Sequence, residues 1–264
     1  MKKIHPTAIV NPEAKIADGV EIGPYSIIGH EVEIGENTFI GPYCFIEFSK
    51  IGANNKIIAH AVIGAPPQDY KYSNERTFVE IGDNNIIREG VSIHRGTPGG
   101  HKITKVGSGC FLMANSHIGH DCVVGNNVIM VNCASAAGHV EIGDNAIISG
   151  LCGIHQFTRI GSFVMLSGGA MANQDIIPYV IAQGDRAKPV GLNIVGLKRA
   201  GFSIESIKSI KHAFKTIFKS GLKLEVAIER LEKEHSSPEV KKIIEFIKGS
   251  KRGIARPRKI FENE

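Results

Sequence analysis

Residues 106–160 carry the sequence VGSGCFLMANSHIGHDCVVGNNVIMVNCASAAGHVEIGDNAIISGLCGIHQFTRI, in which every sixth position holds an apolar residue. These positions are Val106, Leu112, Ile118, Val124, Met130, Ala136, Ile142, Ile148, Ile154 and Ile160. A period of six matches neither the roughly 3.6 residues of a helical turn nor the two-residue alternation of an ordinary strand. It predicts short strands joined by turns, and the glycine that follows several of these residues suits such turns.

The same spacing extends through most of the 264-residue chain. It begins at Val10 and continues, with one slip and two gaps, to Ala172. The two gaps are polar, turn-rich stretches at about 65–79 and 96–105. We expect them to protrude as loops, which on a rigid scaffold often carry function.

Helical spacing replaces the six-residue period in the last quarter of the chain. A first helix is predicted from apolar residues three or four apart, namely Ile204, Ile207, Ile210, Phe214, Ile217 and Phe218. Ser220 and Gly221 predict its end. Two more helices are expected at about Leu224–His235 and Pro238–Lys248, and residues 249–264 are expected to be frayed.

Composition limits the class of protein. With 42% hydrophobic and 22% charged residues, the chain can bury a core and is not a disordered protein. No run approaches about 18 apolar residues and no apolar stretch follows a basic start, so we expect no membrane span, no secretory signal and a cytoplasmic location. The five cysteines are an odd number without a CxxC pair, which argues against a disulfide framework and a cysteine-based zinc site.

Charge is divided unevenly along the chain. From Lys198 to the end there are 17 Lys and Arg residues and 9 Asp and Glu residues, a net charge of +8, whereas the first 197 residues carry a net charge of −3. The basic end predicts contact with an acidic partner: a nucleic acid, an anionic lipid or an acidic carrier protein. A solvated helical face explains the same charges without a partner.

The six-residue pattern resembles that of the hexapeptide-repeat acyltransferases, whose chains wind as a left-handed parallel β-helix. The resemblance covers about residues 5–185. It implies three hexapeptides in each triangular coil, so that residue i lies beneath residue i+18, with coils stacked about 4.8 Å apart. The expected fold is therefore mainly β: a left-handed parallel β-helix over 1–188 with two loop insertions, followed by a C-terminal α-helical domain over 189–264.

This register also accounts for four of the cysteines. Each lies two residues before an aliphatic position of the repeat, a phase that points inward, where a small side chain fits. We therefore expect packing residues, and not nucleophiles, at Cys44, Cys110, Cys122 and Cys152.

Histidines gather in the middle of the repeat. Four of them fall within 39 consecutive residues: His117, His120, His139 and His155. Stacked coils of this register place His120, Gly138 and Gln156 in one column and Asp121, His139 and Phe157 in a second. Three interpretations are open: solvated corner histidines, a metal site, or general-base catalysis.

The spacing of the histidines separates these interpretations. Zinc-binding hexapeptide proteins use histidines five residues apart, and neither His120 nor His139 has such a partner, so we expect no metal. General-base catalysis needs only one histidine of near-neutral pKa to deprotonate an attacking hydroxyl. Gly138, stacked on His120, can offer an unobstructed N–H to the oxygen of a tetrahedral intermediate. Without a G-x-S-x-G motif, direct acyl transfer is expected.

Six short motifs, in order, define a narrower resemblance. They are IHRGT at 93–97, HIGHDC at 117–122, AGHV at 137–140, HQF at 155–157, PYVIAQG at 178–184 and GLNIVGLKRAGF at 191–202. Together they resemble the UDP-N-acetylglucosamine O-acyltransferases of lipid A biosynthesis over nearly the full chain. The resemblance implies a homotrimer that transfers a 3-hydroxyacyl group from acyl carrier protein to the glucosamine 3-OH of UDP-N-acetylglucosamine, without cofactor or metal.

The matched motifs imply a role for each candidate residue. His120 is the general base and Gly138 supplies the oxyanion N–H, while Asp121 and His139 support that centre. Gly168 closes the acyl groove and limits chain length. The substrate-binding positions are Asp69 and Lys71 for the sugar, His117 and Gln156 for sugar or nucleotide, and His94, His155, Asn193 and Arg199 for the nucleotide or for activity.

Two positions depart from the family motif N-x-E-G-L-K-R-R-G. Val195 stands in place of the acid and Ala200 in place of the second arginine. Because arginine binds phosphate through charge-assisted bonds, this loss leaves the acceptor open, and a 3-amino analogue competes with the 3-hydroxyl sugar. A zinc-binding or non-catalytic hexapeptide scaffold, and the N-acyltransferase of the same pathway, are competing interpretations of the whole chain.

Overall fold

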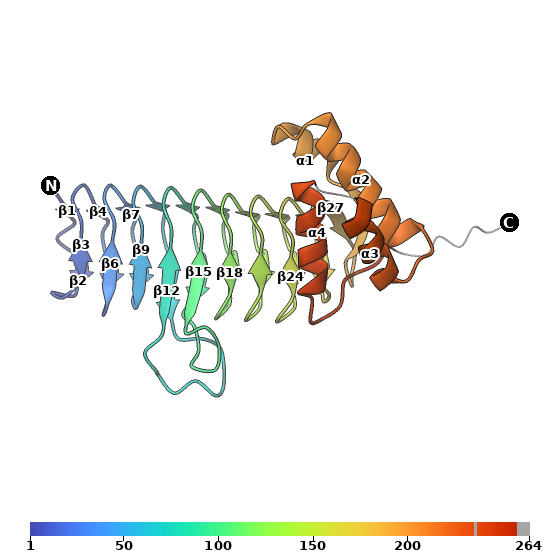
Figure 1. The fold of residues 1–264 in the computed structure, drawn as a ribbon. Helices are drawn as coiled ribbons and strands as arrows, with labels where there is room; N and C mark the ends of the chain where they lie inside the picture. The colour runs from blue at the N-terminus through green and yellow to red at the C-terminus, as the bar shows by residue number, and fades with distance from the viewer. Residues whose placement is uncertain (235–236, 258–264) are drawn as a thin grey trace.

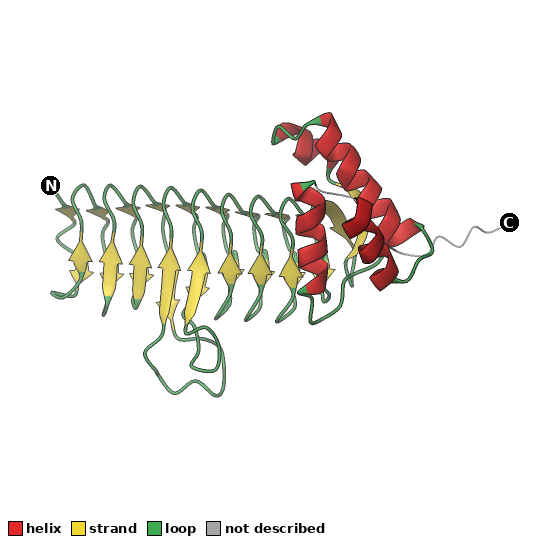
Figure 2. Cartoon of the chain, viewed as in Figure 1, coloured by secondary structure: helices red, strands yellow, loops and turns green. Residues whose placement is uncertain are grey.

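The chain winds as a triangular solenoid of parallel strands with helices packed at its C-terminal end (Figures 1 and 2). The computed structural model describes residues 1–234 and 237–257. The strands form three sheets, which we call A, B and C. Successive strands of the solenoid occupy the three sheets in turn, so each coil contributes one strand to each side, and the last two described strands both lie in sheet A.

The three sheets contain almost all of the described β-structure. Sheet A comprises β1 (Lys3–Ile4), β4 (Glu21–Ile22), β7 (Phe39–Ile40), β10 (Lys56–Ile57), β13 (Ile86–Ile87), β16 (Phe111–Leu112), β19 (Ile129–Met130), β22 (Ile147–Ile148), β25 (Met165–Leu166), β27 (Val180–Gln183) and β28 (Lys188–Leu192). Sheet B comprises β2 (Ile9–Val10), β5 (Ile27–Ile28), β8 (Phe45–Ile46), β11 (Val62–Ala65), β14 (Ser92–His94), β17 (His117–Ile118), β20 (Ser135–Ala136), β23 (Gly153–Ile154) and β26 (Met171–Ala172). Sheet C comprises β3 (Lys15–Ile16), β6 (Val32–Ile34), β9 (Ser49–Ile51), β12 (Phe78–Ile81), β15 (Ile103–Val106), β18 (Val123–Val124), β21 (Glu141–Ile142) and β24 (Arg159–Ile160).

The regular coils stack residue i on residue i+18, as predicted. In sheet B, His117 pairs with Ser135, and Ser135 pairs with Gly153. The residues that follow, such as Ile118 and Ala136, point inward and are fully buried. The six-residue period is therefore the spacing of inward-facing side chains around the three sides of the solenoid, and the predicted β-helix is confirmed.

Tight corners join the strands, and most hold one residue in the left-handed backbone region. Asparagine tolerates this region better than most residues, and Asn115, Asn127 and Asn145 occupy it with φ of 59°, 54° and 59°. Asp121 and His139 take the same corner position, each with φ of 59°. The repeat thus fixes the backbone from which two predicted site residues project.

The core of the solenoid is aliphatic and includes the four predicted packing cysteines. Cys44, Cys110, Cys122 and Cys152 are buried, which confirms that prediction, whereas Cys133 is exposed. All five are free thiols. Burial raises the pKa of the Cys122 thiol to about 12, so this thiol stays protonated and unreactive at neutral pH.

Two long connections leave the solenoid between sheets B and C. Loop 1 (66–77) joins β11 to β12, and loop 2 (95–102) joins β14 to β15. Figure 1 shows both loops below the same edge, and Arg95 hydrogen-bonds to Tyr72 across them. Loop 1 begins at a bulge where Gly64 has φ of 81° and a Cβ would lie 1.7 Å from the carbonyl oxygen of Glu47. Only glycine fits this position.

Four helices follow the solenoid: α1 (Ile194–Arg199), α2 (Ile204–Lys219), α3 (Leu224–Glu234) and α4 (Pro238–Lys248). The predicted helices are confirmed in α2, α3 and α4, although His235, the expected end of α3, lies outside the described residues. Ser203 and Ser237 cap α2 and α4 through their hydroxyl oxygens. Across the described residues, no helix combines the length and the apolar character that crossing a membrane requires.

The segment after α4 corrects one expectation. Residues up to 257 do not fray, because Asp175 holds them: its backbone pairs with Gly253 and Ala255, and its carboxylate accepts the Ser250 hydroxyl at 2.6 Å. Ile254 and Ala255 are buried as a result. The rest of the expected frayed tail, residues 258–264, lies outside the described residues.

The junction between solenoid and helices contains a hairpin that the sequence did not suggest. β28 runs antiparallel to β27, while Ala187 N donates to Met171 O at 2.7 Å and ties the turn to the last coil. β28 begins at Lys188 and α1 at Ile194. The division of the chain into domains at 188 and 189 stays a prediction.

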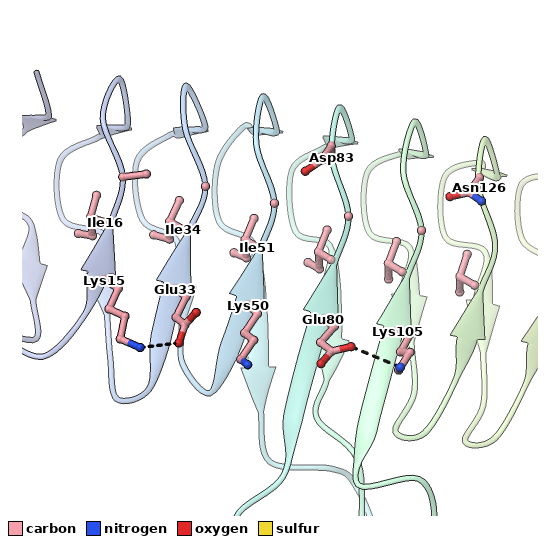
Figure 3. A pocket seen from close by; sticks show the side chains of 18 of the residues that line it. Lys15, Ile16, Glu33, Ile34, Lys50, Ile51, Glu80, Asp83, Lys105 and Asn126 are labelled. Atoms are coloured by element: carbon pink, nitrogen blue, oxygen red, sulfur yellow. Dashed lines mark hydrogen bonds and ion pairs between the residues drawn. The ribbon is translucent and has the colours of Figure 1, made fainter.

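Sheet C presents a charged outer face (Figure 3). A groove of about 980 Å³ runs along it. Its charges alternate in sign along the column Lys15, Glu33, Lys50, Glu80 and Lys105. Lys15 binds Glu33 at 2.9 Å and Lys105 binds Glu80 at 3.4 Å. Because opposite charges pair with each other, this face leaves little net field for a ligand and is best described as solvated.

Candidate active site

A second groove, of about 880 Å³, lies over the outer face of sheet B near its junction with sheet C. Its floor is a column of outward-facing residues that neighbouring strands stack in register: His117, Ser135, Gly153 and Met171. Loop 1 also contributes to its wall. The groove brings together eight of the predicted site residues: Asp69, Lys71, His94, His117, His120, Gly138, His155 and Gln156.

His120 and Asp121 form a hydrogen-bonded pair at the edge of this groove, with 2.9 Å between His120 Nδ1 and Asp121 Oδ2. An ionised carboxylate only accepts hydrogen bonds, so Nδ1 carries the proton and Nε2 is the basic nitrogen. The side chain of His120 is 12% exposed, whereas that of Asp121 is fully buried. His120 is therefore accessible to a substrate in the groove, and the buried carboxylate of Asp121 fixes the orientation of its ring.

Loop 2 supplies the other hydrogen-bond donors to Asp121. The backbone N–H groups of Thr97 and His101 and the Thr97 hydroxyl donate to its oxygens at distances of 2.6–3.1 Å. Burial opposes ionisation of this carboxyl group, but the hydrogen bonds from His120 and Thr97 outweigh it and lower the pKa of Asp121 to about 2. Asp121 is therefore a carboxylate at neutral pH.

Gly138 lies directly against the imidazole of His120. A Cβ at position 138 would lie 2.5 Å from both Cε1 and Nε2 of His120, closer than non-bonded carbon atoms approach. Within the described residues the N–H of Gly138 makes no backbone hydrogen bond. The missing side chain thus lets a free N–H and the basic nitrogen of His120 share one corner of the groove.

His139 packs behind this pair and does not line the groove. Its Nε2 lies 3.8 Å from Asp121 Oδ2, and its ring meets that of His120 at 88° with 5.0 Å between centroids. On its other side the ring stacks on Phe157 at 4.5 Å. Burial lowers the pKa of His139, so the ring is neutral at neutral pH and acts by packing around the pair.

His94 and His117 meet edge to face in the groove, with ring centroids 4.9 Å apart. Burial lowers the pKa of His94 to about 4 and also lowers the pKa of His117. Ser92 Oγ lies 2.8 Å from His117 Nδ1 and fixes that ring. Both rings are neutral at neutral pH, so they offer directional hydrogen bonds to hydroxyl or amide groups and not positive charge.

Loop 1 presents Asp69 and Lys71 through a tight turn. The Asp69 carboxylate accepts the N–H of Lys71 at 3.0 Å, and its carbonyl oxygen accepts the N–H of Tyr72 at the same distance. This is the local capping that aspartate favours in turns. The turn places one anionic and one cationic side chain at the groove.

The sequence matches known families over both halves of the chain. A family model described as UDP N-acetylglucosamine O-acyltransferase, domain 2, matches residues 175–255, and a bacterial transferase hexapeptide model matches 13–48 and 103–135. An acyl-[acyl-carrier-protein]–UDP-N-acetylglucosamine O-acyltransferase from Myxococcus xanthus is 51% identical over 97% of this chain and 100% of its own. The chain belongs to the UDP-N-acetylglucosamine O-acyltransferase family.

Solved structures of the family share the fold. The UDP-N-acetylglucosamine acyltransferase from Francisella novicida superimposes with a TM-score of 0.94 at 40% identity, covering 97% of this chain and 95% of its own. The corresponding protein from Campylobacter jejuni gives a TM-score of 0.92 at 38% identity, covering 97% and 100%. The left-handed parallel β-helix predicted from the hexapeptide pattern is thus shown, and the protein is a transferase.

Three of the residues expected from the family motifs lie away from the groove of this acyltransferase. Gly168 sits at the corner between sheets A and B and lines a separate pocket that includes Phe214 and Phe218 of α2. Arg199 is exposed on α1. Asn193 caps α1, because its Oδ1 accepts the N–H of Gly196 at 3.1 Å and its amide donates to Phe163 O at 3.0 Å.

The groove of the acyltransferase also contains residues that the motifs did not identify. Met171, Asp185 and Arg186 line it, the last two from the turn between β27 and β28. Asp185 Oδ1 accepts the N–H of Arg186 at 2.7 Å, which shapes that turn. Met171 could have been found as the residue one coil beyond Gly153, whereas Asp185 and Arg186 follow the repeat and carry no periodic signal.

Three side chains of the site lie close enough together to be considered as metal ligands. Ligand atoms of His120, Asp121 and His139 lie within 4.8 Å of one another. Both oxygens of Asp121, however, already accept several hydrogen bonds, and His120 Nδ1 is one of the donors. This donor set fits a hydrogen-bonded network better than a cation. The absence of a metal stays a prediction for this acyltransferase, and elemental analysis of the purified protein tests it.

Proposed function

We propose that the protein transfers a 3-hydroxyacyl group from acyl carrier protein to the glucosamine 3-OH of UDP-N-acetylglucosamine, the first step of lipid A biosynthesis, in the cytoplasm. One observation carries the chemistry: the buried carboxylate of Asp121 orients His120 so that its Nε2 opens beside the free N–H of Gly138. The names of the relatives support the substrates. Five free thiols suit a reducing compartment.

The proposed mechanism uses His120 as base and then as acid. Nε2 removes the proton of the sugar 3-OH as its oxygen attacks the thioester carbonyl carbon. The carbonyl oxygen gains the negative charge and accepts a hydrogen bond from the Gly138 N–H. When the intermediate collapses, the C–S bond breaks, the sulfur leaves as the carrier thiol and takes the proton from His120. Asp121 stabilises the imidazolium that forms between these steps.

The remaining groove residues fit an acceptor that is a sugar nucleotide. The neutral rings of His94 and His117, with Asp69 of loop 1, offer hydrogen bonds suited to sugar hydroxyl and acetamido groups. Lys71 supplies a positive charge for a phosphate. At the far end of the groove, His155 and Gln156 are placed to contact the rest of the nucleotide. These roles agree with the family motifs for Asp69, His117, His155 and Gln156. The motifs imply instead a sugar contact for Lys71 and a nucleotide or activity role for His94.

A homotrimer accounts for the site residues that the groove lacks. His120 lies at the corner between sheets B and C, whereas Gly168 lies between A and B, so one chain does not bring both into one groove. The same holds for Arg199 on α1. In a threefold ring each subunit uses two different faces, and a neighbour can then supply these residues to the groove.

The outer faces of the sheets support this assembly. The outward positions of sheet C are mostly charged, as Figure 3 shows for the column that begins at Lys15. Sheets A and B instead expose apolar columns: Ile86, Phe111, Ile129, Ile147 and Met165 on A, and Ile9, Ile27, Phe45 and Val62 on B. Burying A against a neighbour's B removes apolar surface from water and leaves the charged face exposed.

The basic C-terminal region is the proposed contact for acyl carrier protein, which is acidic. Part of its positive charge forms a stripe on α2, where Lys208, Lys211 and Lys215 are exposed and spaced three and four residues apart. Residues with this spacing share one helix face. An acidic partner would be attracted to this stripe before it docks.

Assaying the purified protein and its His120→Ala variant tests the proposal. Wild type should release carrier thiol when given UDP-N-acetylglucosamine and acyl carrier thioesters, and the variant should lose about 10²-fold or more in turnover. Near-normal turnover by a folded His120→Ala variant would show that His120 is not the base. The acceptor is open because Val195 in α1 and Ala200 directly after it stand in place of the family's acid and second arginine. A parallel reaction with the 3-amino analogue decides between the two acceptors.

A further inference from the structure

A buried arginine lies immediately behind the groove and has no role in the mechanism. Arg95 follows His94 in the chain but does not line the groove, and only 4% of the residue is exposed. Its Nη1 donates to Glu47 Oε1 at 2.7 Å and to the Gly64 carbonyl oxygen at 2.9 Å. Its Nε donates to the Tyr72 hydroxyl at 2.7 Å.

The groups that Arg95 joins come from the solenoid and from loop 1. Glu47 follows β8, and Gly64 is the bulge from which loop 1 departs. Tyr72 lies on the returning arm of loop 1. The guanidinium also lies 4.4 Å above the ring of Phe48 and 5.5 Å from that of Tyr72, contacts that favour a planar cation. One side chain therefore fastens the start and the far arm of loop 1 to the same coil.

Tyr72 transmits this anchor to the turn that faces the groove. Its hydroxyl donates to the carbonyl oxygen of Glu75 at 2.6 Å, and its backbone N–H donates to the carbonyl oxygen of Asp69 at 3.0 Å. Asp69 in turn caps Lys71. The path from Arg95 to the two loop residues at the groove thus consists of hydrogen bonds of ordinary length, joined through the side chain of Tyr72.

We propose that Arg95 and Tyr72 are positioning residues that hold Asp69 and Lys71 of loop 1 against the acceptor end of the groove. The proposal rests on the proposed function, since it assumes that Asp69 and Lys71 bind the sugar-nucleotide acceptor. Arg95 acts through Tyr72 and touches no substrate. Loop 1 has mostly exposed residues. Its other tie to the solenoid is the ion pair of Arg76 with Glu31, which lies at the end of the loop next to β12. Without Arg95 and Tyr72, ordering the turn at Asp69 would therefore draw on the acceptor's own binding energy.

Arginine suits this place better than lysine. The guanidinium makes three hydrogen bonds in different directions while it stacks on Phe48. A lysine ammonium is a point charge that can keep the ion pair with Glu47. It cannot at the same time donate to the Tyr72 hydroxyl and stack on Phe48 as the planar guanidinium does. Arg95→Lys should therefore release loop 1 while the half-buried carboxylate of Glu47 keeps a partner.

Tyr72→Phe is the sharpest test, because it removes one hydroxyl and keeps the ring. The KM for UDP-N-acetylglucosamine should rise about 10-fold, the worth of one hydrogen bond to a charged group, while kcat changes by less than about 3-fold. Trypsin should also cut faster within loop 1, after Lys71 or Arg76, than in wild type. Tyr25→Phe is the matched control, because Tyr25 is an exposed corner residue on the first coils, far along the chain from loop 1.

A double-mutant cycle separates positioning from general stability. If Tyr72 acts through Lys71, adding Tyr72→Phe to Lys71→Ala should raise the KM by no more than about 2-fold beyond Lys71→Ala alone. Independent, multiplying effects would overturn the proposal, as would an unchanged KM and unchanged tryptic cleavage in Tyr72→Phe. If wild type transfers no acyl group to the nucleotide sugar, the proposed function fails, whereas the cleavage rates still decide whether Arg95 and Tyr72 hold the loop.

Discussion

Replacing Gly138 with alanine adds a single methyl group where His120 and the oxyanion N–H meet. The new Cβ would lie 2.5 Å from Cε1 and Nε2 of His120, whereas carbon atoms in contact prefer roughly 3.5–4.0 Å. The imidazole must therefore retreat by about 1 Å. Alanine keeps the backbone N–H, so this change displaces the base and leaves the oxyanion donor in place.

The size of the effect follows from this displacement. A misplacement of about 1 Å in a reacting group costs on the order of 10²-fold in rate. Stability should suffer less, toward the lower end of the ~1–3 kcal/mol typical of overpacking, because the ring can move into the open groove. The backbone of Gly138 does not occupy the left-handed region, so alanine adds no conformational strain there.

Thiol release from an acyl carrier thioester gives kcat, and thermal unfolding gives stability. Gly191→Ala is the matched control, since its Cβ would meet no atom within 4 Å. We expect normal turnover in the control and a loss of about 10²-fold in Gly138→Ala. Turnover close to wild type in a folded Gly138→Ala variant would refute the placement of His120 as base beside Gly138.

Three other outcomes are expected. In the folded protein the pKa of His94 is about 4, below its ordinary value of 6.5. Between these pH values the unfolded chain binds a proton at His94 that the folded chain does not, so the free energy of unfolding should fall by up to about 3 kcal/mol as the pH drops from 6.5 to 4. Urea denaturation of wild type and His94→Gln across this pH range measures the effect. Gly168→Met should shift preference toward shorter acyl chains by about 10- to 100-fold. A Cβ fits there, with its nearest atom at 3.7 Å, and in the proposed trimer the longer side chain would fill part of a neighbouring subunit's groove. The same preference between 10- and 14-carbon carriers in wild type and variant would show that Gly168 does not set the chain length. Changing Lys208, Lys211 and Lys215 to Glu should raise the KM for the acyl carrier about 10-fold or more at low salt and less at high salt, with the KM for the nucleotide sugar as control.

The sequence predicted those parts of the site that lie on the repeat. Once the coil length is known, the stacking of Gly138 on His120 follows because the two residues are one coil apart in the chain. The burial of Cys122 follows in the same way from its phase. A repeat converts distance along the chain into position in space, so that residues far apart can be placed without a template for each contact.

Residues outside the repeat could not be placed in this way. Thr97 and His101 donate to Asp121 only because loop 2 folds back on its own coil, and no spacing in the sequence encodes that path. Arg186 enters the groove through an antiparallel hairpin where the six-residue pattern has ended. Asp175 pairs with Ile254 across the whole helical region of the chain. Such contacts depend on tertiary packing that local pattern does not determine.

In a solenoid of this register, the number of residues between two positions determines which face of the solenoid each one occupies. Losing one whole coil from the N-terminal side of the site would shorten the rod but leave every later side chain facing the same direction. Losing a single hexapeptide between His120 and His139 would instead turn everything beyond it by a third of a revolution and carry His155 and Gln156 to another edge. Insertions escape this rule only where they leave and rejoin at one corner, as loops 1 and 2 do. The solenoid can therefore gain or lose whole coils, whereas a change of one hexapeptide between catalytic residues rotates one relative to the other by a third of a revolution.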